Sequence, residues 1–359
     1  MQPVRLSVFL DYKCNFACDH CSVGSSPETE FEMEEDFLDS VFEQLDDVDS
    51  LQQVVFTGGE VTLHKERLLE SIERASEKGY LTRIVSNGWW AHDMASAREM
   101  VDELVEAGLD ELNTSYDDFH TDYMAVENIV NLVEASVERD MTVAVACVVG
   151  DEDPEYDRER IESLVDERLD TPVEQRRDVT LIEDVAAPLG SGAQLDTANV
   201  AAINEIDRGC TDVMNTLSVH PDGTVKSCCG HAMFYYPDLT MGSLHEEPLA
   251  DIVERGKGNL IYWLIHEVGP VELIDRLDVD NDTDYANICH ACGDLLGAHR
   301  EDLFEYIREN QEELVRDDIL LNDAVQKRVG SLMENREEVL NHLAEVRETD
   351  SEDTEFLSA

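Results

Sequence analysis

Basic side chains are scarce in this chain. Lysine and arginine total 26, six of them lysines, against 82 aspartates and glutamates, and the formal net charge is −56. No basic stripe is present to neutralise phosphates, so nucleic acid is excluded as a partner. The acidic residues are spread over nearly every predicted helix, which favours a halophilic surface whose self-repulsion is screened in a salt-rich cytoplasm. An acidic patch for a basic partner is the alternative.

Long apolar runs are missing as well. No run reaches the length of about 20 residues that spans a bilayer, so no membrane partner is expected. The chain enters a strand-like segment at residues 4–10, without the pattern of a secretory segment. Because its nine cysteines include CxxC spacings, we expect reduced metal ligands in a cytoplasmic protein rather than disulfides.

Three of the cysteines lie close together near the start of the chain. Cys14, Cys18 and Cys21 read C-N-F-A-C-D-H-C, and thiolates at this spacing can converge on one soft metal centre. A zinc site would need a fourth protein ligand, and none adjoins the triplet. Three thiolates leave one iron of a 4Fe–4S cluster open, which suits a ligand that is also a reactant. A structural zinc knuckle or unrelated thiols are the alternative.

Strand-like and helix-like segments alternate up to about residue 185. Apolar β-prone runs are predicted as strands at residues 4–10, 54–56, 83–85, 111–115, 141–149 and 179–182. Helical periodicity predicts helices around residues 33–45, 68–75, 100–105 and 129–133. This alternation predicts an α/β fold with a parallel sheet and helices outside it.

The cysteine triplet resembles the CxxxCxxC signature of the radical S-adenosylmethionine (SAM) enzymes. The family usually has an aromatic residue before the third cysteine, and this position is His20 here. The resemblance implies a partial (β/α)6 TIM-like barrel over residues 1–195. It also implies a 4Fe–4S cluster that is held by three cysteines and binds SAM.

Loops after the predicted strands carry the residues expected to hold SAM, because parallel barrels place their active sites at the carboxyl ends of strands. In radical SAM enzymes a GGE segment holds the amino group of SAM. The resemblance assigns this role to Gly58, Gly59 and Glu60. Ser86 and Asn87 are similar to the segment that contacts the ribose and carboxylate of SAM. Ordinary tight turns are the alternative at both places.

The loop after the fourth predicted strand adds further candidates. The family often has a serine and an acid here that face SAM or the substrate, and Ser115 and Asp117 match them. His120 is a candidate proton donor or acceptor, or else a hydrogen-bonding strut. The glycine-containing segment 188–192 is similar to one that passes along the adenosine, although it also fits a plain linker.

A second set of cysteines follows at residues 205–300. Cys210 and Cys228 flank a predicted hairpin around Pro221-Asp222-Gly223, and Cys289 and Cys292 lie downstream. The spacing resembles the twitch module, a shortened relative of the SPASM domain. The resemblance implies a small β-hairpin/α domain with one auxiliary 4Fe–4S cluster. Four thiols also suit tetrahedral zinc, which stays open.

Cys229 directly follows Cys228, so either residue can be the fourth ligand. A free thiol at this place could give a hydrogen atom to a substrate radical, as some epimerases of the family do. Cys229 is therefore a candidate catalytic residue, and an inert bystander is the alternative.

The last part of the chain is predicted to be helical. We expect one helix and an exposed acidic loop within residues 244–285, and further helices at 301–347. The polar, acidic stretch 348–359 is expected to be disordered.

The resemblance implies an enzyme that reductively cleaves SAM to a 5′-deoxyadenosyl radical, which then takes a hydrogen atom from a substrate. An electron donor such as a ferredoxin or flavodoxin is the implied partner. A peptide or protein-derived substrate is the first expectation. The alternatives are radical dehydrogenation or epimerisation of a small alcohol, aminosugar or cofactor precursor, and a non-catalytic iron–sulfur or zinc protein. The glycine-rich loops after strands argue against the last, since an electron carrier needs no SAM pocket.

Overall fold

The computed structural model describes residues 1–195, 200 and 202–316 of the chain. Two compact units are present, Met1–Phe304 and Glu305–Ala359, and the site described below lies within the first. No helix in the described part of the chain is both long and apolar enough to cross a membrane.

A nine-stranded sheet organises the first unit, in the order β6-β5-β4-β3-β2-β1-β7-β8-β9. Its strands are β1 (Arg5–Phe9), β2 (Gln53–Thr57), β3 (Leu81–Val85), β4 (Glu111–Ser115), β5 (Thr142–Val149), β6 (Val179–Val185), β7 (Thr216–Val219), β8 (Thr224–Lys226) and β9 (Thr240–Ser243). Strands β1 to β6 are all parallel and each lies beside the next along the chain. This arrangement confirms the predicted α/β fold with a partial six-strand barrel.

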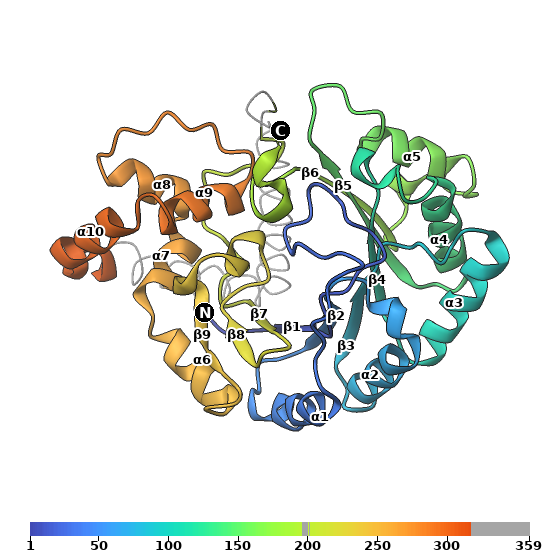
Figure 1. The fold of residues 1–359 in the computed structure, drawn as a ribbon, viewed down its shortest axis with the longest axis horizontal. Coiled ribbons are helices and arrows are strands. Elements are labelled where there is room, and N and C mark those ends of the chain that lie inside the picture. Colours follow the sequence, from blue (N-terminus) through green and yellow to red (C-terminus); the bar gives the residue numbers. More distant parts are fainter. Residues whose placement is uncertain (196–199, 201, 317–359) are drawn as a thin grey trace, which may run out of the picture. The chain divides into compact units, whose positions relative to one another are not determined.

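Helices cover one face of these parallel strands. They are α1 (Glu35–Gln44), α2 (Lys65–Glu77), α3 (Met94–Glu106), α4 (Glu127–Glu138) and α5 (Arg158–Asp166). Figure 1 shows α2 to α5 along the outer side of the strands. Sequence analysis did not predict α5, which buries only Ile161 and Val165 and whose mean hydropathy is low. Asp157 caps it by accepting a hydrogen bond from the amide of Arg160.

The two faces of the parallel strands differ in burial. Leu6, Val54 and Ile84 point toward the helices and are fully buried. On the opposite face, Val85 is 39% exposed and Ile182 is 48% exposed. Strands of a parallel sheet are usually buried on both sides. The inner face of this partial barrel is therefore accessible, which makes it available to a ligand.

The predicted hairpin is confirmed as β7 and β8, which pair antiparallel on either side of Gly223. Gly223 has a φ of +80°, a conformation that glycine adopts without strain. Strand β7 also pairs in parallel with β1, so the hairpin continues the sheet of the barrel. Strand β9, which sequence analysis missed, extends it further. The domain boundaries near residues 195–205 and 300 stay predictions.

Helices of the C-terminal part are more numerous than predicted. Where one helix was expected within residues 244–285, the structure has α6 (Leu249–Lys257), α7 (Leu260–Glu267) and α8 (Pro270–Arg276). Gly258 and the Gly269–Pro270 step separate them, because neither continues a helix well. They are followed by α9 (Ile288–Leu296) and α10 (Arg300–Glu313). The second predicted C-terminal helix and the tail 348–359 lie outside the described residues.

Candidate active site

The cysteine triplet lies in the loop between β1 and α1. It lines a pocket of about 310 Å³ at the carboxyl ends of the parallel strands. The same pocket is lined by six of the other predicted site residues: Gly58, Gly59, Ser86, Asn87, Ser115 and His120. The structure therefore brings together residues from loops after β1, β2, β3 and β4, as expected for a parallel barrel.

The thiols of the triplet are suited to a cationic centre. Burial raises the pKa of Cys14 to about 12, and burial together with the neighbouring Cys21 and Cys14 raises the pKa of Cys18. Asp117 and Asp19 raise the pKa of Cys18 further, so its thiolate is disfavoured without a nearby cation. Iron would supply the positive charge that allows the thiols of Cys14 and Cys18 to ionise beside Cys21. The donor set thus fits an iron–sulfur cluster.

The turn after β2 packs against the backbone of the cysteine loop. Gly59 donates its amide hydrogen to the carbonyl oxygen of Asp11 at 3.1 Å, and Glu60 donates to that of Lys13 at 2.7 Å. A Cβ atom on Gly59 would lie 2.0 Å from the Lys13 oxygen. This approach is possible only without a side chain, which explains why glycine is needed next to the triplet.

Glu60 joins two of the predicted SAM-binding loops. Its side chain is fully buried, and burial raises its pKa. One carboxylate oxygen accepts hydrogen bonds from the amide and hydroxyl of Thr62, at 3.0 and 2.5 Å, and from Ser86 at 2.8 Å. The other accepts from the amide of Asn87 at 2.7 Å. Glu60 therefore holds the loops after β2 and β3 together, while its contact with the SAM ammonium group stays a prediction.

We expect Glu60→Gln to weaken SAM binding by roughly ten- to a hundredfold, since hydrogen bonds to a charged group are worth about 1.5–3 kcal/mol. Glutamine keeps the size of the side chain, but it removes the negative charge and puts an NH₂ group where the carboxylate oxygen accepts hydrogen bonds from Thr62, Ser86 or Asn87. Equilibrium dialysis with SAM and the iron-loaded protein measures the effect. Glu103→Gln is the matched control, because Glu103 pairs with Lys65 at the surface. Equal dissociation constants for both variants would contradict the prediction.

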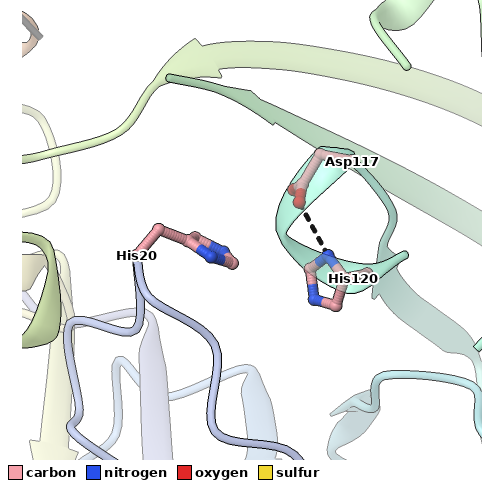
Figure 2. Close-up of side chains that lie close together, drawn as sticks. All are labelled: His20, Asp117 and His120. Atoms are coloured by element: carbon pink, nitrogen blue, oxygen red, sulfur yellow. Dashed lines mark hydrogen bonds and ion pairs between the residues drawn. The ribbon is translucent and has the colours of Figure 1, made fainter. Parts of the chain in front are cut away.

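Asp117 and His120 form a buried pair in the loop after β4 (Figure 2). Nδ1 of His120 lies 2.8 Å from Oδ1 of Asp117. The carboxylate also accepts the amide hydrogens of Phe119, at 3.0 Å, and Val148, at 3.1 Å. Asp117 is therefore occupied within the protein and orients His120. Nε2 of His120 is left toward the pocket, 3.5 Å from the hydroxyl of Ser115.

His20 completes a group of three with this pair. Figure 2 shows its ring directed from the cysteine loop toward Asp117 and His120, and the ligand atoms of the three residues lie within 4.8 Å of one another. Two imidazoles and a carboxylate can bind a divalent metal. Because Asp117 already accepts hydrogen bonds from three groups, we interpret the set as a hydrogen-bonding wall of the pocket. Burial lowers the pKa of His20 to about 4, so its ring is neutral at pH 7.

Sequence analysis missed two residues next to the triplet. His231 lines the pocket, and Tyr235 donates its hydroxyl hydrogen to the carbonyl oxygen of Ser22. Both residues come soon after the Cys228-Cys229 pair in the sequence. Their closeness to predicted metal ligands could have marked them as candidates. The predicted adenosine segment also lies here, because the amide of Ser191 donates to the carbonyl oxygen of Cys21 at 3.1 Å. The C-terminal half of the chain therefore contributes to the wall of the pocket.

The second set of cysteines forms a separate buried site. Cys210 precedes β7, Cys228 follows β8, and Cys289 and Cys292 lie one turn apart on α9, where they share a face. Burial raises the pKa of each of these thiols, and other members of the set raise the pKa of Cys228, Cys289 and Cys292 further. The thiol of Cys228 therefore lies near those of Cys210, Cys289 and Cys292. Such a donor set fits a metal centre that neutralises them.

Cys229 faces a different environment from Cys228. Its side chain is exposed, and the groups that act most strongly on its thiol are Asp212, Ser7 on β1, and Arg5 and Arg83 on β1 and β3. The three strand residues alternate along the strands with Leu6 and Ile84, so they lie on the inner face. Desolvation by the groups around it raises the pKa of this thiol to about 11. At pH 7 it carries its proton.

Asp11, at the end of β1, gives the protein a pH-dependent stability. Its carboxylate is 1% exposed, and burial raises its pKa from 3.8 to about 6. Folding favours the protonated form of Asp11. The stability that this carboxyl contributes is therefore fully present below pH 4 and is lost as the pH rises past 6. We expect Asp11→Asn to raise the free energy of unfolding by about 3 kcal/mol at pH 7.5 and to leave it unchanged near pH 4.

Chemical unfolding of wild type and variant at both pH values, in the same salt, measures this difference. The exposed Asp170→Asn is the matched control and should change neither value. A stabilisation by Asp11→Asn that is equal at the two pH values would show that ionisation of Asp11 is not its cause.

Comparisons with known proteins match both halves of the chain. Residues 11–165 match the family model described as the radical SAM superfamily, and residues 210–293 match the model described as an iron-sulfur cluster-binding domain, SPASM. YydG of Bacillus subtilis (strain 168), named as a peptide biosynthesis protein, is 23% identical over 306 residues, which cover 83% of this chain and 93% of YydG.

Two solved structures are also similar to this chain. BtrN in complex with AdoMet and 2-DOIA is 15% identical, with a TM-score of 0.45 and coverage of 81% of this chain and 92% of BtrN. Streptococcus suis SuiB bound to precursor peptide SuiA is 15% identical, with a TM-score of 0.47 and coverage of 81% of this chain and 76% of SuiB.

Proposed function

This chain is a radical SAM enzyme with a SPASM iron–sulfur cluster-binding domain, and we propose that it modifies a peptide by removing and then replacing one hydrogen atom. The replacement hydrogen comes from the thiol of Cys229. The observation that carries the proposal is the divergence of two adjacent thiols, Cys228 toward three other cysteines and Cys229 toward the inner face of the barrel.

A peptide is the substrate favoured by two observations. YydG, which matches most of this chain, is named for peptide biosynthesis. The inner face of the barrel is accessible and carries exposed aliphatic side chains at Val85 and Ile182. An extended peptide could lie along this face with one residue at the pocket that holds the triplet.

The residues of the pocket divide into those that hold the cofactors and those that shape the site. Cys14, Cys18 and Cys21 would hold the 4Fe–4S cluster, whose open iron and bound SAM supply a 5′-deoxyadenosyl radical that removes a hydrogen atom from the substrate. Gly58 and Gly59 let the backbone approach the ligand, and Ser86, Asn87 and Ser115 offer hydrogen bonds to it. His120 and Asp117 orient the substrate side of the pocket.

A hydrogen-atom donor must carry its hydrogen at the working pH. The raised pKa of Cys229 keeps the S–H bond intact, whereas a thiolate would have no hydrogen atom to give. The substrate carbon gains the hydrogen atom and Cys229 becomes a thiyl radical. One electron from a ferredoxin or flavodoxin and one proton then restore the thiol, so the peptide is neither oxidised nor reduced. Epimerisation at the attacked carbon is the product expected from return of hydrogen to the other side.

Cys229→Ala tests the proposal. The iron-loaded enzyme is incubated in D₂O with SAM, dithionite and a peptide encoded beside this gene. Because thiol hydrogens exchange with solvent, the wild type should place one deuterium in each product molecule. The variant should keep its iron and still form 5′-deoxyadenosine, but its deuterated product should fall at least a hundredfold. Cys147→Ala is the control, since Cys147 is fully buried in β5.

The same experiment separates the alternative reaction. The four-thiol site adjoins Cys229, so an electron could instead leave the substrate radical and enter that site. A product two hydrogens lighter, without deuterium and unaffected by Cys229→Ala, would establish oxidation in place of hydrogen return. Small alcohols, aminosugars or cofactor precursors would then replace peptides as the first substrates to try. We also propose a cytoplasmic location, where such one-electron donors are found.

A further inference from the structure

A chain of buried hydrogen bonds connects the cysteine-triplet loop to the four-thiol site. His220 follows β7 and is 2% exposed. Its Nδ1 lies 2.5 Å from the hydroxyl oxygen of Tyr12, two residues before Cys14, and its Nε2 lies 2.9 Å from the hydroxyl oxygen of Ser218. Ser218 in turn lies 2.9 Å from the carbonyl oxygen of Cys228.

Each group in this chain has a defined role as donor or acceptor. The hydroxyl of Ser218 also lies 3.1 Å from the sulfur of Met233, which is a weak acceptor. A carbonyl oxygen only accepts and accepts more strongly, so Ser218 gives its one hydroxyl hydrogen to Cys228. Nε2 of His220 must then carry the hydrogen that Ser218 accepts. A neutral imidazole has one N–H, so Nδ1 accepts and Tyr12 donates to it. All hydrogens therefore point the same way, from Tyr12 to Cys228.

Aromatic packing fixes the plane of the His220 ring. Phe9 stacks on it with centroids 4.5 Å apart and an interplanar angle of 12°, and Phe234 meets it edge-on at 5.6 Å. A ring held in this way cannot turn without breaking both hydrogen bonds. Side-chain networks that are fully satisfied and buried in this manner make local structure rigid.

The carbonyl of Cys228 belongs to the peptide unit that joins Cys228 to Cys229. We propose that Tyr12, His220 and Ser218 are positioning residues that fix this peptide unit. The fixed unit keeps the sulfur of Cys228 in the four-thiol site and the sulfur of Cys229 beside Ser7 on the inner face. This inference rests on the proposed function of Cys229, and it makes that thiol dependent on the loop that carries the triplet.

Tyr12→Phe and His220→Phe test the inference in the full-length, iron-loaded enzyme. Each keeps an aromatic ring and removes hydrogen bonds of the chain. His220→Gln is the conservative variant, because its amide can accept from Tyr12 and donate to Ser218. Tyr80→Phe is the matched control, since it removes a tyrosine hydroxyl that bonds Asp46 at the surface.

The readout that is independent of turnover is the rate at which iodoacetamide alkylates Cys229, followed by mass spectrometry at pH 8. In Tyr12→Phe and His220→Phe we expect it to rise about fivefold or more, because the released peptide unit lets the thiol leave the inner face. Iron content and SAM cleavage should stay within twofold of wild type. Deuterium incorporated per 5′-deoxyadenosine should fall about tenfold, and His220→Gln should restore most of both values.

Unchanged alkylation in iron-loaded Tyr12→Phe would overturn the inference, and so would loss of iron in that variant, which would indicate a merely structural role. Tyr12→Phe keeps the test valid if His220→Phe does not fold. Failure of the proposed function looks different. Cys229→Ala would then leave deuterium incorporation intact, whereas the alkylation rates would still report on the position of Cys229.

Discussion

Replacing Cys14, Cys18 or Cys21 by alanine is expected to abolish formation of 5′-deoxyadenosine, with a loss of at least a thousandfold. All three residues line one pocket, and two thiols cannot hold a cluster whose fourth iron must stay open for SAM. The fold should survive, because the triplet lies in a loop and its side chains are only partly buried. Chromatography of the reaction products and far-ultraviolet circular dichroism measure the two effects.

Controls separate the loss of a cluster from damage to the barrel. Cys147→Ala removes a thiol from the fully buried face of β5 and should leave SAM cleavage unchanged. Each triplet variant should also keep the iron of the second site. Wild-type rates of SAM cleavage in the triple-alanine variant would disprove the assignment of the active site to this loop.

Loss of the four-cysteine site is expected to halve the iron content of the protein. Two 4Fe–4S clusters give about eight irons per chain, so Cys228→Ala or Cys292→Ala should lower the content to about four. The triple-alanine variant at Cys14, Cys18 and Cys21 should keep the complementary half. Iron and acid-labile sulfide assays after anaerobic purification measure both changes.

Cys229→Ala is the sharpest control for this experiment. It removes the neighbouring thiol, which bonds Ser7, and should keep all eight irons. Loss of about four irons in this variant would show that Cys229, and not Cys228, is the ligand. Stoichiometric zinc in the wild-type site would show a structural metal there in place of an iron–sulfur cluster.

Local features of the sequence were sufficient to predict the barrel. The six parallel strands and their helices follow from apolar periodicity, which reflects burial of one face of each element. The weakly apolar α5 and the short strand β9 were not predicted, because few of their residues are buried. The three short helices α6 to α8 were merged into one prediction, since their apolar residues are close together and only glycine and proline divide them.

The candidate site was predictable where a motif carries its own spacing. Cys14, Cys18 and Cys21 lie within eight residues, and Gly58 and Gly59 follow a recognisable strand, so their meeting at one pocket could be expected. The structural role of Glu60 could not be predicted from the sequence. Sequence shows an acid beside two glycines, whereas the structure shows its carboxylate holding Thr62, Ser86 and Asn87.

The sequence by itself therefore determined the fold class, the cysteine sets and the family, because each depends on residues close together along the chain. Only the tertiary structure placed Cys228 near three other cysteines and the adjacent Cys229 near Ser7. It also joined Tyr12 to His220, which are 208 residues apart. Such contacts depend on how β7 pairs with β1, and that pairing is set by packing across the whole sheet rather than by local pattern.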